Sequence, residues 1–139
     1  MPKGQAENEA KVTESVGGGS ETVLIIEDEE QVGKLAVSLL ERYGYNVLTE
    51  ADGEHGLDQY TKNKKAIDLV LLDLTMPRMS GKMVFEKILE INPDVKVIIC
   101  SGQSDEDIRE GILSHAQDFL KKPYRVKDLA KTVRKVLDS

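Results

Sequence analysis

The chain has little of what several classes of protein require. Its one cysteine, Cys100, excludes an internal disulfide. No apolar run among its 139 residues approaches the roughly 20 that a membrane-spanning helix needs, and its first residues lack the apolar core of a secretory signal. The net charge of −6 disfavours a nucleic-acid-binding surface. We therefore expect a cytoplasmic protein whose partners are neither nucleic acids nor membranes.

The first 21 residues also lack any apolar period. Residues 17–20 read Gly-Gly-Gly-Ser, so residues 1–21 are predicted to be a flexible tail or linker. A glycine-rich loop that binds phosphate follows a strand and opens a helix, whereas this glycine run precedes the first apolar segment. From Thr22 onward the aliphatic residues are spread evenly, which predicts one domain with one core over residues 22–139.

Short apolar segments alternate with longer segments of helical period after residue 21. We expect strands at residues 22–26, 46–49, 69–72, 95–100 and 118–121. We expect helices at residues 32–43, 81–91 and 126–137, and after Asp52 and Ser104. Five strands that alternate with five helices predict an α/β fold: a five-stranded parallel sheet with helices on both faces and right-handed crossovers.

The helix expected after Ser104 is the weakest of the five. Residues 104–107 match a capping box, with Asp107 in place of the usual Glu. Gly111 is expected inside this helix, where it costs roughly 1 kcal/mol relative to alanine. Only Ile108 and Ile112 are clearly inward-facing. A marginal helix of this kind suits an element that switches between two conformations.

The carboxyl ends of the strands of a parallel sheet lie at one edge, where open α/β sheets carry their chemistry. Asp73 ends the aliphatic run 69–72, and Met76-Pro77 behind it leads into an exposed loop rather than a tight turn. The same edge collects the side chains that follow the other strands: Glu27, Asp28, Ser101 and Lys122. By contrast, Glu29 and Glu30 are interpreted as first-turn acids that the helix dipole favours.

Three carboxylates that meet at one edge repel one another and raise each other's pKa unless a cation joins them. Oxygen ligands favour a hard metal, and Mg²⁺ tolerates few protein ligands plus waters. With a lysine and a serine beside it, the carboxylate of Asp73 is equipped to attack phosphorus, because these groups share the charge of the equatorial oxygens. The site has no obvious general base, which suits a phosphoryl acceptor better than a hydrolase.

Four segments carry a resemblance to a known family: VLIIEDEE, LVLLDLTMPRMSG, VIICSG and FLKKPY. In this order and spacing, residues 22–138 resemble the receiver domain of bacterial two-component response regulators. The resemblance implies a flavodoxin-like (βα)5 fold in which Asp73 accepts a phosphoryl group from a histidine kinase or a phosphotransfer domain. It also implies a Mg²⁺ ion held by Asp28, Asp73 and the backbone carbonyl of Thr75, with Glu27 helping through water.

The resemblance implies further roles at the other strand ends. Ser101 and Lys122 would contact the phosphoryl group, and the bond between Lys122 and Pro123 would be cis. Ser101 and Phe119 would form the switch. The output would pass to an unknown downstream protein, through the face made by the helix after Ser104, the strand 118–121 and the last helix.

Three positions depart from the usual pattern of the family. Glu27 replaces the first Asp of the acidic pair, and its extra methylene shifts the metal or its waters. His115-Ala116 stands where the family often has Gly-Ala, and Phe119 replaces a Tyr, so it has no hydroxyl to donate. Thr75 occupies the position of the second Asp of aspartyl-phosphate phosphatases and offers neither acid nor base at neutral pH. We expect slow phosphate loss unless another protein helps, although Gln103 could orient a water.

Alternative functions stay open at this stage. The domain could be a degenerate receiver that acts only as a protein-binding module, although its complete set of acidic, serine and lysine residues argues against this. It could be a phosphatase with an Asp nucleophile, although the second Asp is missing. The chain ends at Ser139, shortly after the last helix, so we expect either a stand-alone regulator or the carboxyl-terminal receiver of a hybrid histidine kinase. The domain itself is not expected to be an enzyme.

Overall fold

A computed structural model describes residues 17–74, 76, 79–102 and 111–139, together with all their side chains except that of Ile112. The strands are β1 (Thr22–Ile26), β2 (Asn46–Glu50), β3 (Leu69–Asp73), β4 (Val97–Ser101) and β5 (Asp118–Lys121). The helices of the described residues are α2 (Glu30–Arg42), α3 (Gly53–Asn63), α4 (Gly81–Ile91), the 3₁₀ helix η1 (Gly111–His115) and α6 (Val126–Asp138).

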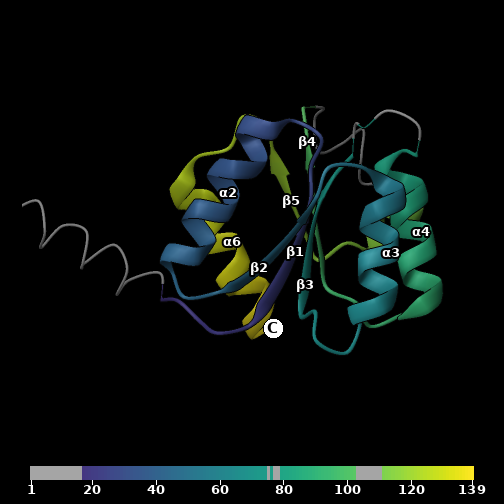
Figure 1. The fold of residues 1–139 in the computed structure, drawn as a ribbon, viewed down its shortest axis with the longest axis horizontal. Coiled ribbons are helices and arrows are strands. Elements are labelled where there is room, and N and C mark those ends of the chain that lie inside the picture. Colours follow the sequence, from purple (N-terminus) through teal and green to yellow (C-terminus); the bar gives the residue numbers. More distant parts are fainter. Residues whose placement is uncertain (1–16, 75, 77–78, 103–110) are drawn as a thin grey trace, which may run out of the picture.

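The strands form one parallel sheet in the order β2-β1-β3-β4-β5. Helices α2 and α6 cover one face of the sheet, and α3 and α4 cover the other (Figure 1). The predicted α/β class with a five-stranded parallel sheet is confirmed.

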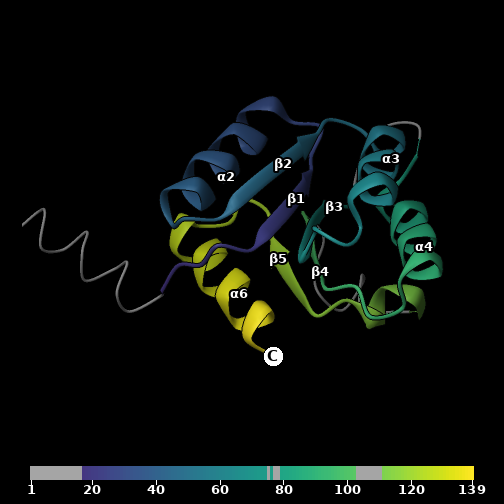
Figure 2. The same cartoon turned by 60° about the horizontal axis from the view of Figure 1, so that its bottom comes forward.

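Alternate residues along the central strands divide the core into two layers. Val23 and Ile25 of β1 pack with α2 and α6, whereas Leu24 and Ile26 pack with α3 and α4. All five residues of β3 are buried, since a strand covered on both faces has no solvent side. Figure 2 shows the two helical layers from a second direction, with η1 beside α4.

Most predicted boundaries agree with the structure, but the fourth strand was placed too early. Residues 95–100 were expected, and β4 is Val97–Ser101. Val95 belongs to the turn after α4, because its backbone N–H donates to the carbonyl of Asn92 at 3.1 Å. Ser101 pairs with Lys121 of β5, so it is the last residue of the strand and not the first residue beyond it.

The expected position of Gly111 inside an α-helix is wrong. Gly111 has φ +58°, in the left-handed region, and begins the 3₁₀ helix η1. A glycine adopts this backbone without steric cost, and it cannot continue a right-handed helix there. The capping box 104–107 and Ile108 lie outside the described residues.

The glycine segment, residues 17–20, packs on the domain. The N–H of Gly19 donates to the carbonyl of Tyr43 at 3.1 Å, and the Arg134 guanidinium donates to the carbonyl of Gly18 at 3.0 Å. A Cβ atom on Gly18 would lie 2.0 Å from the Tyr43 carbonyl oxygen. Glycine is therefore required for close approach of two backbones here. The boundary between tail and domain stays a prediction.

Among the described residues, no helix is both long enough and apolar enough to cross a membrane. The cytoplasmic location expected from the sequence stays a prediction.

Candidate functional site

The strand order reverses direction between β1 and β3. The chain moves from β1 outward to β2 on one side, and from β3 outward to β4 and β5 on the other. At such a switch point the connections leave in opposite directions, and the crevice between the two carboxyl ends takes a ligand.

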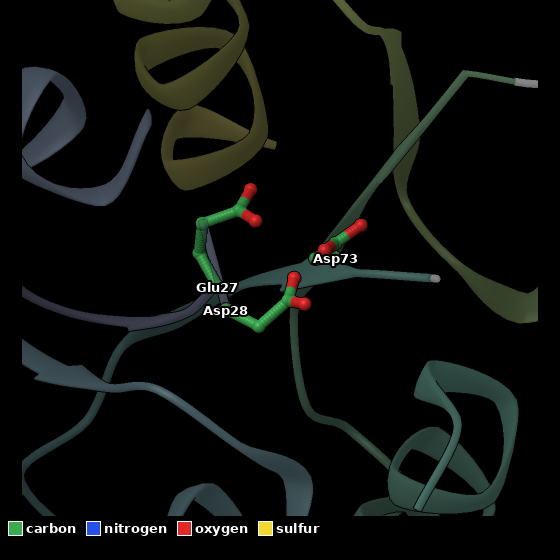
Figure 3. A group of neighbouring side chains, drawn as sticks. All are labelled: Glu27, Asp28 and Asp73. Carbon is green, nitrogen blue, oxygen red and sulfur yellow. The ribbon is translucent and has the colours of Figure 1, made fainter. Parts of the chain in front are cut away.

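Three carboxylates meet in this crevice: Glu27 and Asp28 after β1, and Asp73 at the end of β3 (Figure 3). Each contributes an oxygen that lies within 4.8 Å of the other two. Asp73 is only 2% exposed and Glu27 only 7%, whereas Asp28 is open to solvent. The three acids lie close together as predicted, and two of them are buried.

The chain around Asp73 is held close to the sheet edge on both sides of the next loop. The N–H of Leu74 donates to the carbonyl of Cys100 at 2.9 Å, which extends the pairing of β3 with β4 by one residue. The N–H of Gly81, the first residue of α4, donates to the carbonyl of Leu74 at 3.1 Å. A Cβ atom on Gly81 would lie 2.4 Å from the carbonyl oxygen of Asp73. Glycine therefore lets α4 begin directly against the backbone of Asp73.

Lys122 brings the positive charge of the site. Its Nζ lies 3.0 Å from Oε1 of Glu27, 2.9 Å from Oε1 of Glu29 and 3.6 Å from Oδ2 of Asp73. The N–H of Lys122 donates to the carbonyl of Ser101 at 2.7 Å, which fixes its backbone beside β4. One ammonium thus serves several carboxylates.

The pKa of Asp73 shows how crowded the site is. The pKa of this carboxyl is raised to about 8, chiefly by burial and then by its hydrogen bonds with Asp28 and Glu27 and the charge of Glu27, while the charge of Lys122 opposes the rise. For Lys122, burial lowers the pKa, but the hydrogen bonds to Glu29 and Glu27 together with the charges of Asp73 and Glu27 outweigh burial and raise the pKa overall.

The donor set suits Mg²⁺. Hard oxygen ligands from a few carboxylates, one of them open to solvent, match an ion that keeps several of its waters. A divalent cation at this place would also favour the charged form of Asp73, whose pKa is raised by burial first and by its acidic neighbours second.

The other predicted site residues are placed as follows. The bond between Lys122 and Pro123 is cis, as the resemblance implied. Ser101 is fully buried at the end of β4. Phe119 is half-buried in β5, paired with Ile99 and packed against the core layer of α3 and α4. Thr75 and Gln103 lie outside the described residues.

Glu29 is the site residue that the sequence reasoning missed. It was interpreted as a first-turn acid, but its carboxylate reaches Lys122 at 2.9 Å. A sequence signal exists: in extended backbone, residues two apart point to the same side, and Glu29 stands two positions after Glu27. Its φ of −81° and ψ of 108° are extended, so this rule applies.

The fold and the site together define an α/β domain with a buried carboxylate and a candidate cation site at its switch point. Residues 23–134 match the response regulator receiver domain family. The chain belongs to this family, since the match covers well over half of its length.

Individual relatives agree with this assignment. The chemotaxis protein CheY of Treponema pallidum is 32% identical over 139 residues, covering 99% of this chain and 90% of the relative. The sensor kinase CckA of Brucella abortus is 33% identical over 135 residues, which are 96% of this chain but only 14% of the kinase. A chain in the crystal structure of the CheX-CheY-BeF3-Mg²⁺ complex from Borrelia burgdorferi superimposes with a TM-score of 0.78 at 29% identity, covering 84% of this chain and 88% of that one.

The chain is therefore a phosphoacceptor signalling domain of the two-component type, as predicted, and neither alternative function is favoured. Receiver domains bind Mg²⁺ at an acidic pocket and interact with histidine kinases or phosphotransfer partners and with downstream proteins.

Proposed function

We propose that Asp73 is the residue that accepts the phosphoryl group. We also propose that Mg²⁺ is held by Asp28, Asp73 and the backbone carbonyl of Thr75, with Glu27 helping through water. The observation that carries this proposal is the position of Asp73: a buried carboxylate at the switch point, with two acids and the ammonium of Lys122 around it.

In the transfer step, a carboxylate oxygen of Asp73 forms a P–O bond while the P–N bond of a phosphohistidine breaks. The electron pair of the broken bond goes to the imidazole nitrogen of the donor, and the donor leaves as a neutral histidine because its other ring nitrogen already carries a proton. Bound Mg²⁺ supplies positive charge for the phosphoryl oxygens and keeps the Asp73 carboxyl ionised. The Lys122 ammonium and the Ser101 hydroxyl contact the same oxygens in this proposal, so the charge that develops is shared.

The phosphoryl group then shifts the equilibrium between two conformations. Its oxygens attract the Ser101 hydroxyl, and the space that Ser101 leaves is taken by Phe119. Support comes from the sheet, where Ser101 ends β4 and Phe119 lies on the neighbouring strand β5. New contacts to the phosphoryl group favour one state, and the downstream protein binds this state at the face made by the helix expected after Ser104, β5 and α6.

The donor is proposed to be a histidine kinase or a phosphotransfer domain. Similarity to the sensor kinase CckA supports a receiver that is part of a larger kinase, and similarity to CheY supports a separate receiver. Slow phosphate loss is proposed as well, because Thr75 has no acidic or basic group to activate water. A Thr75→Asp variant that loses phosphate at the wild-type rate contradicts this part.

The acceptor assignment is tested with phosphoramidate and Mg²⁺, followed by intact mass. We expect one phosphate on the wild-type chain and none on Asp73→Asn, which keeps the shape of the side chain but lacks the nucleophilic charge. Asp58→Asn, at an exposed position of α3, is the matched control and should take up phosphate like wild type. Phosphate uptake by Asp73→Asn contradicts the assignment.

A further inference from the structure

The ammonium of Lys122 lies closer to two of the carboxylates around it than to the third. Its Nζ lies 2.9 Å from Oε1 of Glu29, and 3.0 and 3.2 Å from the two oxygens of Glu27. Its distance to Oδ2 of Asp73 is 3.6 Å, which exceeds hydrogen-bond length. An ammonium has three N–H donors, so the two glutamates hold the lysine beside the acceptor rather than on it.

The side chain of Glu29 makes no hydrogen bond that caps its own helix. Glu29 is the N-cap of α2, yet its carboxylate makes no capping hydrogen bond. Its backbone N–H donates instead to Oε2 of Glu27 at 3.1 Å, and the two side chains converge on Lys122. Glu29 therefore reaches the site from the N-cap position of α2.

We propose that Glu29 is a positioning residue, which keeps the Lys122 ammonium just beyond hydrogen-bond distance of Asp73 in the unphosphorylated domain and releases it when Asp73 carries a phosphoryl group. This inference rests on the proposed role of Asp73. A phosphoryl group adds close to two negative charges and strong acceptor oxygens, so the ammonium gains a better partner than either glutamate.

Burial decides which glutamate loses its ion pair with Lys122. The side chain of Glu29 is 62% exposed, whereas that of Glu27 is 5% exposed. Water screens and replaces the contact of Glu29, so its loss costs little. Loss of the Glu27 contact would leave a buried carboxylate without its counter-ion. The lysine therefore pivots about Glu27 and leaves Glu29.

The consequence is a brake on phosphorylation. Glu29 competes with the incoming anionic donor for Lys122, and its own charge repels that donor. For Glu29→Gln we expect phosphorylation by phosphoramidate about threefold faster than in wild type, the size that an exposed ion pair permits.

Glu30→Gln is the matched control. It removes the same charge one residue later, from a side chain that is 78% exposed and pairs with Lys34 at 2.8 Å rather than with Lys122. We expect Glu30→Gln to be phosphorylated at the wild-type rate. Equal rates for the two variants, or a slower rate for Glu29→Gln, would overturn the proposal.

A second measurement needs neither phosphate nor Mg²⁺. The side-chain NMR signals of Lys122 report on the carboxylates around its ammonium. We expect them to shift in Glu29→Gln and to stay in place in Glu30→Gln; unchanged Lys122 signals in Glu29→Gln overturn the proposal. If wild type takes up no phosphate at all, the role of Asp73 fails and the release step fails with it. A phosphorylated wild type with equal variant rates refutes Glu29 alone.

Discussion

Two charge clusters lie at opposite edges of the sheet and have opposite effects on the charge of their carboxylates. At the carboxyl edge, the acidic cluster places one ammonium, Lys122, among several carboxylates. At the amino edge, the arginine cluster places the Arg134 guanidinium of α6 between Glu21 and Asp138, 2.7 and 2.8 Å from their nearest oxygens. The same guanidinium donates to the Gly18 carbonyl at 3.0 Å and to the Tyr45 hydroxyl at 3.3 Å.

The direction of the pKa shifts shows the difference. The hydrogen bond from Arg134 lowers the pKa of Glu21, so folding favours the charged carboxylate there. Burial and neighbouring acids raise the pKa of Asp73 to about 8, so folding disfavours its charge. The arginine cluster thus stabilises the fold, whereas the acidic cluster costs stability that a cation or a phosphoryl reaction can use.

The largest expected effect is the loss of the arginine cluster. Arg134→Met keeps most of the apolar length of the side chain and removes the guanidinium. We expect the free energy of unfolding at pH 7 to fall by about 3 kcal/mol, because the partly buried carboxylate of Glu21 and the carbonyl of Gly18 lose a charged hydrogen-bond donor, while the exposed Asp138 adds little. Urea unfolding measures this.

Lys135→Met is the control on the same helix. Lys135 pairs with Asp118 at 2.9 Å, but its side chain is 74% exposed, so the expected loss is below about 1 kcal/mol. Equal losses for the two variants would remove the distinction. Because the pKa of Glu21 is lowered, the contribution of the arginine cluster is present above the ordinary carboxyl pKa and is lost as pH falls through the lowered value.

The acidic cluster should respond in the opposite direction. Without Mg²⁺ at pH 8, we expect Asp73→Asn to raise the free energy of unfolding by about 2 kcal/mol, after allowance for screening by water and Lys122.

The pH dependence follows from the sign of the shift. The pKa of Asp73 is raised from 3.8 to about 8, so the folded state holds a proton that the unfolded state loses. The wild type therefore loses stability relative to Asp73→Asn as pH rises from about 4 to 8. Urea titrations at pH 5 and pH 8 measure the difference in the free energy of unfolding between Asp73→Asn and wild type. A smaller difference at pH 8 than at pH 5 would contradict the prediction.

A smaller gain is expected from Mg²⁺ itself. At a concentration ten times its dissociation constant, a ligand that binds only the folded state adds about 1.4 kcal/mol. We expect this gain for wild type in thermal unfolding at pH 8, and little of it for Asp28→Asn. Sodium chloride at equal ionic strength is the control. An equal gain in stability for wild type and Asp28→Asn would mean that Mg²⁺ binds at a site without Asp28.

The smallest effect concerns the glycine segment that the arginine cluster holds. Gly18→Ala sets a methyl group against the carbonyl of Tyr43, so the segment detaches and loses its hydrogen bonds. We expect a loss of about 1 kcal/mol. Among the residues that the structure describes, none lies within 4 Å of a Cβ atom on Gly102, so Gly102→Ala is the control and should change stability by less. An unchanged Gly18→Ala would mean that the segment contributes nothing to the fold.

Much of the site was predictable because its residues follow strands directly. Glu27, Asp28, Asp73 and Lys122 each stand at a strand end, and a parallel sheet brings all such ends to one edge. The cis bond at Pro123 and the fold class were expected from the family segments, and both agree with the structure. The roles of Ser101 and Phe119 in switching stay predictions.

Two features of the backbone could not be read from the sequence pattern. Gly111 was expected in an α-helix, but single-sequence periodicity does not report a positive φ. The contacts of Gly18 and Gly19 with Arg134 and Tyr43 could not be read from composition either, because these partners lie 24 or more positions away along the chain; the linker assignment of residues 1–21 stays a prediction.

The alternation of apolar strands and amphipathic helices dictated the layers of this protein and the edge at which its acids gather, because side-chain periodicity is a local property of the backbone. The partner of Lys122 is another matter. Its ammonium is within hydrogen-bond distance of Glu29 but not of Asp73, and the two distances differ by less than an ångström. These groups come from separate elements, so only the packing of the folded chain sets the distances.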